Sequence, residues 1–357
     1  MSEQPDPRAL RHVRPDILAM AGYTPGEQVG DCIKLNTNEP PQPPAPGVMA
    51  ALSAVVPERL RLYPDPRATA LRAAAAERLA VKPEQILAGN GSDDCLTILY
   101  RAVLAPGGRV ACPWPTYGLY DTLASLQGVE MVHADYRIHA GGWELPEVLP
   151  RLGARLVLVA NPNNPSATLT PPDQLRRLAD RLDGILAVDE AYVDFAPPGS
   201  SVLPYLDAHP NLVVLRTFSK SYSLAGARLG LLIAAAPLVE QLMKVKDSYN
   251  INHLTQQAGI AALADTAHHR AGIALVQAER VRLEAALAGF GWSWPPSAGN
   301  FLLCEVGPRA GELYRGLKAQ GILVRWWDRP LLSTRLRITI GTPAQNDRLV
   351  AALRGLR

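Results

Sequence analysis

Near its middle the chain passes directly from an apolar run into a loop of amides and prolines, Arg155-Leu156-Val157-Leu158-Val159-Ala160-Asn161-Pro162-Asn163-Asn164-Pro165. The apolar run has the length of a strand, and it lacks the polar alternation of a strand that faces water on one side. Such strands are typical of parallel sheets that carry helices on both faces. We therefore predict a parallel sheet with this strand in its interior.

Further short apolar strands alternate with helical segments on both sides of this run. We expect strands at 86–88, 109–112, 185–188, 212–216 and 229–235, and helices at 71–80, 95–104, 117–127 and 172–181. This alternation predicts an α/β fold. The last hundred or so residues differ, because helices at 271–290, 313–320 and 345–356 accompany strands at 301–305, 322–325 and 336–340, which predicts an α+β module. Residues 1–47 are rich in proline and glycine, with one short helical candidate, and are interpreted as an extended arm.

Polar motifs follow four of the expected strands. They are Gly89-Asn90-Gly91-Ser92-Asp93-Asp94, Asn161-Pro162-Asn163-Asn164-Pro165, Asp189-Glu190-Ala191-Tyr192 and Thr217-Phe218-Ser219-Lys220. Taken singly, each has a plain structural interpretation, as a tight turn, a rigid loop, a helix start or a surface lysine. Ligands of open α/β sheets bind beyond the carboxyl ends of the strands. The four motifs together therefore favour a ligand site at one edge of the sheet.

Composition excludes several classes of protein. The 357 residues are 48% hydrophobic, and 36 basic against 33 acidic residues leave a net charge of +3, without a block of like charge that would bind nucleic acid. The four cysteines are scattered, so we expect reduced thiols rather than disulfides or a zinc site. The polar N-terminus lacks the apolar core of a signal peptide, and the apolar run 231–236 is too short to span a membrane, so we expect a cytoplasmic protein.

The motifs and their order make a resemblance specific. The chain resembles the aspartate-aminotransferase-type enzymes of fold type I, which use pyridoxal 5'-phosphate (PLP), and among them it is most similar to the histidinol-phosphate aminotransferases. The matching stretches run in the family's order along nearly the whole chain: residues 33–39, 63–66, 91–94, 115–118, 161–165, 189–192, 216–220, 225–230 and 336–341. The chain departs from the pattern at Ser166-Ala167, where Thr-Gly is usual, at Asp94, where glutamate is common, and at Pro40-Pro41. These departures concern the loops at the entrance of the site.

The resemblance implies a fold and an assembly. A large PLP-binding domain, residues 48–245, would hold a mostly parallel seven-stranded sheet sandwiched by helices. A smaller α+β domain, residues 246–357, would be completed by the arm, residues 1–47, which would also contact a partner subunit. We expect a homodimer with a shared active site that acts on small molecules, and neither nucleic acid, membrane nor metal as a partner.

The resemblance also implies which residues hold the cofactor. Lys220 matches the lysine that forms a Schiff base with PLP and moves the proton, and Asp189 matches the carboxylate at the pyridine nitrogen. Asn161 and Tyr192 match the donors to the ring oxygen, and Tyr117 matches the aromatic ring that stacks on PLP. The residues that match the phosphate site are Gly91, Ser92, Asp93, Thr217, Ser219 and Arg228, together with Tyr63 from the other subunit. Lys220, Asp189 and Tyr192 would be catalytic.

The substrate would be held by cationic and arm residues. Arg337 lies on the opposite face of its strand from Leu336, Ile338 and Ile340, and it matches the family's carboxylate-binding arginine. Arg325 matches the arginine that meets the phosphate of histidinol phosphate, and Tyr23 and Asn38 match arm residues near the substrate. Trp326 and Trp327 are interpreted as packing or as pocket wall.

The expected reaction is a ping-pong amino transfer in histidine biosynthesis, from L-histidinol phosphate to 2-oxoglutarate, giving imidazole-acetol phosphate and L-glutamate. An aminotransferase for aromatic amino acids and a threonine-phosphate decarboxylase remain alternatives on the same scaffold. A PLP-binding regulator would need a DNA-binding module before the arm. We do not expect one, because the family's arm begins near residue 10.

Overall fold

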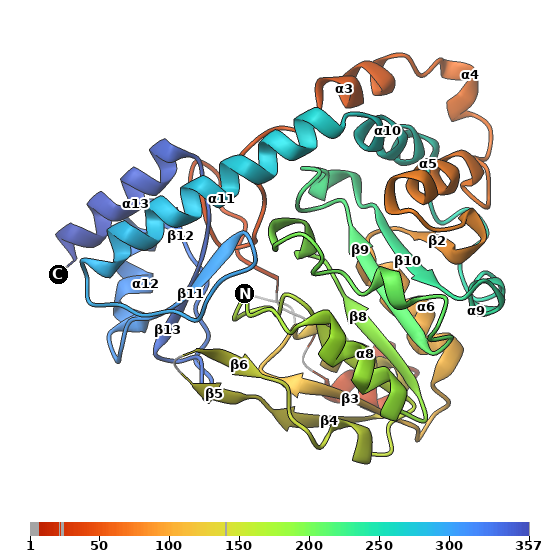
Figure 1. Ribbon diagram of the computed structural model, residues 1–357, viewed down its shortest axis with the longest axis horizontal. Helices are drawn as coiled ribbons and strands as arrows, with labels where there is room; N and C mark the ends of the chain where they lie inside the picture. Colours follow the sequence, from red (N-terminus) through yellow and green to blue (C-terminus); the bar gives the residue numbers. More distant parts are fainter. Residues whose placement is uncertain (1–6, 21, 23–24, 140, 357) are drawn as a thin grey trace.

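A seven-stranded sheet forms the centre of the computed structural model, which describes residues 7–20, 22, 25–139 and 141–356 (Figure 1). Its strands, in spatial order, are β2 (Ile86–Gly89), β10 (Gly230–Ala234), β9 (Leu212–Thr217), β8 (Ile185–Asp189), β7 (Leu156–Ala160), β3 (Arg109–Trp114) and β4 (Glu130–Asp135). All neighbours are parallel except β10, which is antiparallel to both β2 and β9. The predicted mostly parallel seven-stranded sheet is confirmed, and the edge strand β4 is the member whose position the strand pattern did not predict.

Helices cover both faces of this sheet, so its interior strands are buried throughout. Val157 and Val159 belong to one core cluster together with α5 (Thr69–Leu79), α8 (Pro172–Arg181) and α10 (His253–Ala264). Leu156 and Leu158 belong to a second cluster with α6 (Ser92–Val103), α7 (Leu119–Gln127) and α9 (Ala236–Leu242). Successive side chains of a strand point to opposite faces. The continuous apolar run of the sequence therefore supplies both clusters.

The C-terminal part has a core cluster of its own. It contains α11 (Thr266–Ala288), β11 (Phe301–Glu305), α12 (Ala310–Ala319), β12 (Ile322–Leu323), β13 (Arg335–Thr339) and α13 (Pro343–Gly355). Figure 1 shows α11 as the long helix that runs from α10 to α13. The arm contributes β1 (Ile33–Lys34), which pairs in parallel with β12. The division of the chain at residues 47 and 245 stays a prediction.

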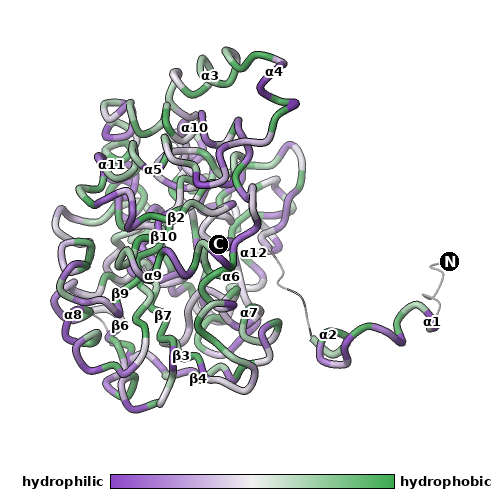
Figure 2. Tube along the Cα trace, turned by 90° about the vertical axis from the view of Figure 1, so that its right-hand side faces the viewer, coloured by the Kyte–Doolittle hydropathy of each residue, from purple (hydrophilic) through white to green (hydrophobic). Residues whose placement is uncertain are grey.

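The remaining elements lie mainly at the periphery. They are α1 (Pro7–Leu10), α2 (Pro15–Ala19), α3 (Pro46–Ser53), α4 (Pro57–Leu60), the hairpin of β5 (Arg137–His139) and β6 (Gly142–Glu144), and the short 3-10 helices η1 (Pro83–Gln85), η2 (Leu149–Arg151), η3 (Val193–Phe195), η4 (Leu203–Tyr205) and η5 (Ala225–Ala227). Figure 2 shows α1 and α2 standing out from the body of the molecule. None of the helices in the described part of the chain is long and apolar enough to cross a membrane.

A close backbone contact positions the first polar turn against the sheet. Gly230, the first residue of β10, faces the turn that starts α6, and a Cβ atom built on Gly230 would lie 2.2 Å from the backbone nitrogen of Ser92. The same atom would lie 2.4 Å from the carbonyl carbon of Gly91. Only a glycine at this position lets the start of α6 rest directly on the sheet.

We expect Gly230→Ala to push the start of α6 away from β10. Forcing a methyl group into packed backbone costs about 1–3 kcal/mol, so the melting temperature should fall by about 1–4 °C. Differential scanning calorimetry of the cofactor-free protein measures this change. Gly226→Ala is the matched control, because a Cβ atom at Gly226 meets nothing within 4 Å. Equal melting temperatures for the two variants would contradict the close contact.

Candidate active site

A cavity of about 470 Å³ lies where the strands β7, β8 and β9 end. Its lining brings together most of the residues predicted for the site: Asn38, Ser92, Asp93, Tyr117, Asp189, Tyr192, Thr217, Ser219, Lys220, Arg228, Arg325 and Arg337. The parallel strands explain this convergence, because their carboxyl ends meet at one edge of the sheet. Gly91, Asn161 and Tyr63 are not part of the lining, and Tyr23 lies outside the described residues.

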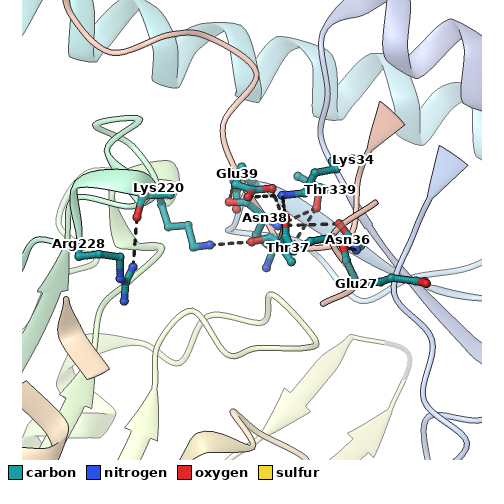
Figure 3. A network of polar contacts seen from close by, with 12 residues as sticks. Glu27, Lys34, Asn36, Thr37, Asn38, Glu39, Lys220, Arg228 and Thr339 are labelled. Carbon is teal, nitrogen blue, oxygen red and sulfur yellow. Dashed lines mark hydrogen bonds and ion pairs between the residues drawn. The ribbon is translucent and has the colours of Figure 1, made fainter. Parts of the chain in front are cut away.

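Lys220 reaches across this cavity from the turn after β9. Its Nζ donates a hydrogen bond of 2.8 Å to the carbonyl oxygen of Thr37 in the arm (Figure 3). Burial disfavours the charged amine, and repulsion from Arg337 adds to this effect, so the pKa of Lys220 falls to about 8. An appreciable share of the amine is therefore neutral near physiological pH, as a group that forms imines or accepts protons requires.

Asp189 ends β8 and is buried at the floor of the cavity. Its Oδ2 accepts a hydrogen bond of 2.9 Å from Tyr120 Oη, and its Oδ1 accepts one of 3.2 Å from the backbone nitrogen of Ala191. Burial nevertheless raises the pKa of Asp189 to about 6. Sequence reasoning missed Tyr120, and the only signal for it is its position on α7 about one turn after Tyr117. The two rings make an edge contact at 5.6 Å between centroids.

The start of α6 and the turn after β9 bring together the residues predicted to hold a phosphate, which we call the phosphate cup: Gly91, Ser92, Asp93, Thr217, Ser219 and Arg228. Gly91 precedes α6 with φ +89°, and a Cβ atom there would lie 2.5 Å from Arg228 Nη2. Arg228 Nη1 donates to Ser219 Oγ over 3.4 Å, and Nη2 lies 3.3 Å from Asp93 Oδ2. Helix N–H groups, hydroxyls and a guanidinium together suit a phosphate.

Two departures from the family pattern keep the local structure intact. Asp94 Oδ2 accepts a hydrogen bond of 2.8 Å from the backbone nitrogen of Asn90, so the shorter acid still closes the turn before α6. Ser166 Oγ accepts one of 2.9 Å from Asn163 Nδ2. Ala167 takes a left-handed φ of +59°, a conformation that glycine adopts at lower cost.

Asn161 is fully buried behind the cavity. Its Nδ2 donates a hydrogen bond of 3.1 Å to the carbonyl oxygen of Thr170, and its Oδ1 accepts one of 2.7 Å from the backbone nitrogen of Thr170. The side chain therefore holds the loop that follows β7. A contact of Asn161 with the cofactor stays a prediction.

The arm is held beside Lys220 by hydrogen bonds of Asn38. Asn38, with φ +57°, donates from Nδ2 to Tyr192 Oη over 3.0 Å and accepts at Oδ1 from Thr339 Oγ1 over 3.0 Å. Asn300 Nδ2 donates to the Asn38 carbonyl oxygen over 3.0 Å. Asn38 thus joins Tyr192, which follows β8, to Thr339 of β13; Figure 3 shows Asn38 beside Thr339.

The two predicted substrate arginines lie in the same cavity. Arg337 is buried, and its guanidinium donates to Asn164 Oδ1 and to the carbonyl oxygen of Asn36, each over 2.6 Å. Arg325 Nη1 donates over 3.2 Å to the carbonyl oxygen of Pro25. The sequence did not single out Asn36 or Asn164 as the residues that orient Arg337.

Tyr63 lies on the surface, with 81% of its area exposed, and its ring stacks on Tyr249 at 4.3 Å between centroids. Its predicted contact with a partner's phosphate stays a prediction.

Comparisons with known proteins agree on one family. The profile of the aminotransferase class I and II family matches residues 30–353. Histidinol-phosphate aminotransferase 1 of Trichormus variabilis is 42% identical over 349 residues, which are 97% of this chain and 99% of the relative. The histidinol-phosphate aminotransferase of Synechocystis sp. is 41% identical over 352 residues, or 97% and 98% of the two chains.

Solved structures share the fold over nearly the whole chain. The histidinol-phosphate aminotransferase of Sinorhizobium meliloti in complex with PLP has a TM-score of 0.89 at 27% identity, and the match covers 99% of this chain and 100% of that one. A mutant aspartate aminotransferase of Thermus thermophilus has a TM-score of 0.83 at 20% identity, and the match covers 97% of this chain and 100% of that one. At this identity the likeness supports the fold alone.

The residues around the cavity fit PLP. The phosphate cup suits its phosphate, and the contact of Gly91 with Arg228 leaves no room for a side chain at the cup. Asp189 offers a buried carboxylate to a ring nitrogen, and Lys220 offers an amine of lowered pKa. In the described part of the chain no group of histidine, cysteine and acidic side chains is arranged to hold a metal ion.

We expect Asp189→Asn to stabilise the cofactor-free protein at pH 8. Asp189 has a pKa of about 6 when folded against about 3.9 in an unfolded chain, so the folded protein loses stability as the pH rises from about 4 to about 6. The amide removes this penalty, which is at most about 3 kcal/mol, and the gain should vanish near pH 4. In the PLP complex the effect of Asp189→Asn should be the opposite, because the protonated ring nitrogen would stabilise the charged carboxylate. The variant should therefore bind PLP more weakly.

Urea unfolding of the cofactor-free proteins at pH 4 and pH 8 measures the first effect, and equilibrium titration with PLP measures the second. Asp183→Asn, at an exposed site, is the control. A variant at Asp189 that is no more stable than the wild type at pH 8 would show that burial does not disfavour this carboxylate.

Proposed function

The chain belongs to the class I and II aminotransferase family, and on this premise we propose that it transfers the amino group of L-histidinol phosphate to 2-oxoglutarate. The products are imidazole-acetol phosphate and L-glutamate, and the pathway is histidine biosynthesis. Support comes from relatives of this name that are 42% and 41% identical over nearly the full chain. The observation that carries the proposal is that Arg325 and Arg337 share one cavity with Lys220.

The cofactor of this aminotransferase is PLP, which supplies the carbonyl that takes up the amino group and the conjugated ring that accepts the Cα electrons. The phosphate cup would hold its phosphate. Asp189 would keep the ring nitrogen protonated, because a buried carboxylate gains most from a cationic partner. Lys220 Nζ, with a pKa of about 8, would take the proton from the substrate Cα as a general base.

The two arginines explain the choice of substrates. Histidinol phosphate carries a phosphate dianion and no carboxylate, whereas 2-oxoglutarate carries two carboxylates. One arginine is sufficient for the single carboxylate of an aromatic amino acid, and a second is needed for the proposed pair of substrates. The aromatic alternative is less favoured because relatives that match nearly the full chain at 42% and 41% identity are histidinol-phosphate aminotransferases by name.

The proposal includes a homodimer with a shared site and a cytoplasmic location. Tyr63 lies beside further exposed apolar side chains in the same stretch of the chain, namely Val56, Leu60 and Leu62, and it stacks on the exposed Tyr249. Contiguous exposed apolar surface of this kind marks contact sites. We propose that it faces a second copy of the chain and brings Tyr63 to the partner's phosphate cup.

We expect histidinol phosphate to convert the PLP form of the enzyme fastest. In single-turnover measurements its kcat/KM should exceed that of phenylalanine by at least about tenfold, because one charge-assisted hydrogen bond alone is worth roughly 1.5–3 kcal/mol. Threonine phosphate should release no CO₂. Lys220→Ala is the control, which should bind PLP without turnover. A faster reaction with phenylalanine, or CO₂ from threonine phosphate, would refute the assigned donor.

The shared site predicts complementation between two inactive subunits. Tyr63→Phe should weaken PLP binding, and Lys220→Ala should abolish turnover. After subunit exchange in an equal mixture, half of the dimers are mixed and each has one intact site, so about a quarter of the wild-type sites should be restored. Activity is measured at limiting PLP. If native mass spectrometry shows mixed dimers but activity equals the sum of the parents, Tyr63 does not act across the interface.

A further inference from the structure

Arg325 and Arg337 form a cross-strand pair of like charges. They lie opposite each other in an antiparallel bridge, with Arg325 N 2.9 Å from the Arg337 carbonyl oxygen and Arg337 N 2.8 Å from the Arg325 carbonyl oxygen. The Cβ atoms of directly opposite residues are about 5 Å apart, and like charges in such pairs repel. Two guanidinium groups in one cavity therefore need a neighbouring group that offsets their mutual repulsion.

Trp327 is that neighbour. The guanidinium carbon of Arg325 lies 5.2 Å from the centroid of the Trp327 ring, and that of Arg337 lies 5.3 Å from the same centroid. All three side chains line the cavity. An indole face carries the negative end of a quadrupole and is the strongest aromatic partner for a cation. One ring thus attracts both arginines. Unlike a carboxylate, it has no net charge and does not neutralise either of them.

The adjacent tryptophan has a different environment. Trp326 Nε1 donates a hydrogen bond of 2.9 Å to the Ser333 carbonyl oxygen, and its ring lies 5.9 Å from that of Tyr314 in the C-terminal core. Trp326 is therefore a packing residue, as the sequence suggested. The two tryptophans supply a matched pair, because Trp327 lies against both arginines and Trp326 packs in the C-terminal core.

The two arginines depend on the ring to different degrees. Arg337 is buried, donates hydrogen bonds to Asn164 and Asn36, and lies 5.4 Å from the Phe301 ring centroid. Arg325 is only half-buried, so a long flexible side chain must be kept over the cavity rather than in water. Loss of the indole should displace Arg325 first.

We propose that Trp327 is the positioning residue that makes Arg325 and Arg337 one site for a doubly anionic ligand. This inference rests on the proposed function, and it specifies that the site selects a phosphate dianion or a second carboxylate through the ring that contacts both cations. A singly charged carboxylate needs Arg337 alone and should not depend on Trp327.

The test measures binding to the PLP-loaded enzyme by isothermal titration calorimetry, with two unreactive probes. Succinate carries two carboxylates, and 3-phenylpropionate carries one. Trp327→Leu should weaken succinate binding by about threefold to thirtyfold, the range of one cation–π contact, and 3-phenylpropionate binding by less than about twofold. Trp327→Phe should retain most of the affinity for succinate, and Trp326→Leu should change the binding of neither probe. Equal losses for both probes, or none, would overturn the proposal.

A double-mutant cycle separates positioning from general packing. Arg325→Met should weaken succinate binding, and Trp327→Leu should add little in that background, because the residue it positions is already absent. Additive losses would overturn the proposal. If Trp327→Leu does not fold, the same cycle with Trp327→Met, which is long and flexible but has no π face, should give the same loss and keeps the test decisive.

Binding of these probes does not depend on the amine donor. If Trp327→Leu weakens only succinate binding and the enzyme does not use histidinol phosphate, the role of Trp327 stands and histidinol phosphate is not the amine donor. If the enzyme uses histidinol phosphate and Trp327→Leu changes neither kcat nor KM, the donor is confirmed and the role of Trp327 is refuted.

Discussion

Burial of two ionisable groups at one edge of the sheet is the constraint on which the site depends. Desolvation raises the pKa of Asp189 to about 6 and lowers that of Lys220 to about 8. Each group is thereby made less stable in its charged form and more responsive to a partner of suitable charge. A ligand that brings a cation to Asp189 and a carbonyl to Lys220 relieves both costs at once, which is a physical reason for its tight binding.

A buried ionic cluster holds the two strand ends that carry these groups. Arg216 Nε lies 2.9 Å from Glu190 Oε2, and Arg216 Nη1 lies 3.0 Å from Asp194 Oδ1. Glu190 directly follows Asp189, and Ser221, which directly follows Lys220, donates a hydrogen bond to Asp194. Breaking a buried pair on one side leaves an uncompensated charge. The cluster therefore fixes the spacing of β8 and β9 where the chemistry requires it.

Much of this arrangement could be predicted from the sequence, because polar residues interrupt apolar strands at one edge of the sheet. The buried strands and the lysine turn were clear for that reason. The edge strand β4 was not, since Glu130 and His133 are exposed and blur its pattern. The apolar residues of β10 do not indicate that this strand runs antiparallel to its neighbours. Tyr120 and Asn164 act through neighbours distant in the chain, and local patterns carry no information about such contacts.

The arm completes the site from a third direction. Its carbonyl at Thr37 accepts a hydrogen bond from Lys220 Nζ, its carbonyl at Asn36 accepts one from Arg337, and Asn38 bonds Tyr192. Lys220, Arg337 and Tyr192 are thus held by three consecutive residues of one segment. Since β1 of the arm pairs with β12, which leads to Arg325, the same segment also sets where the second arginine begins. An anion held between Arg325 and Arg337 would therefore lie against the same segment that accepts the hydrogen bond of Lys220, so the arm would set the distance between the bound anion and the amine.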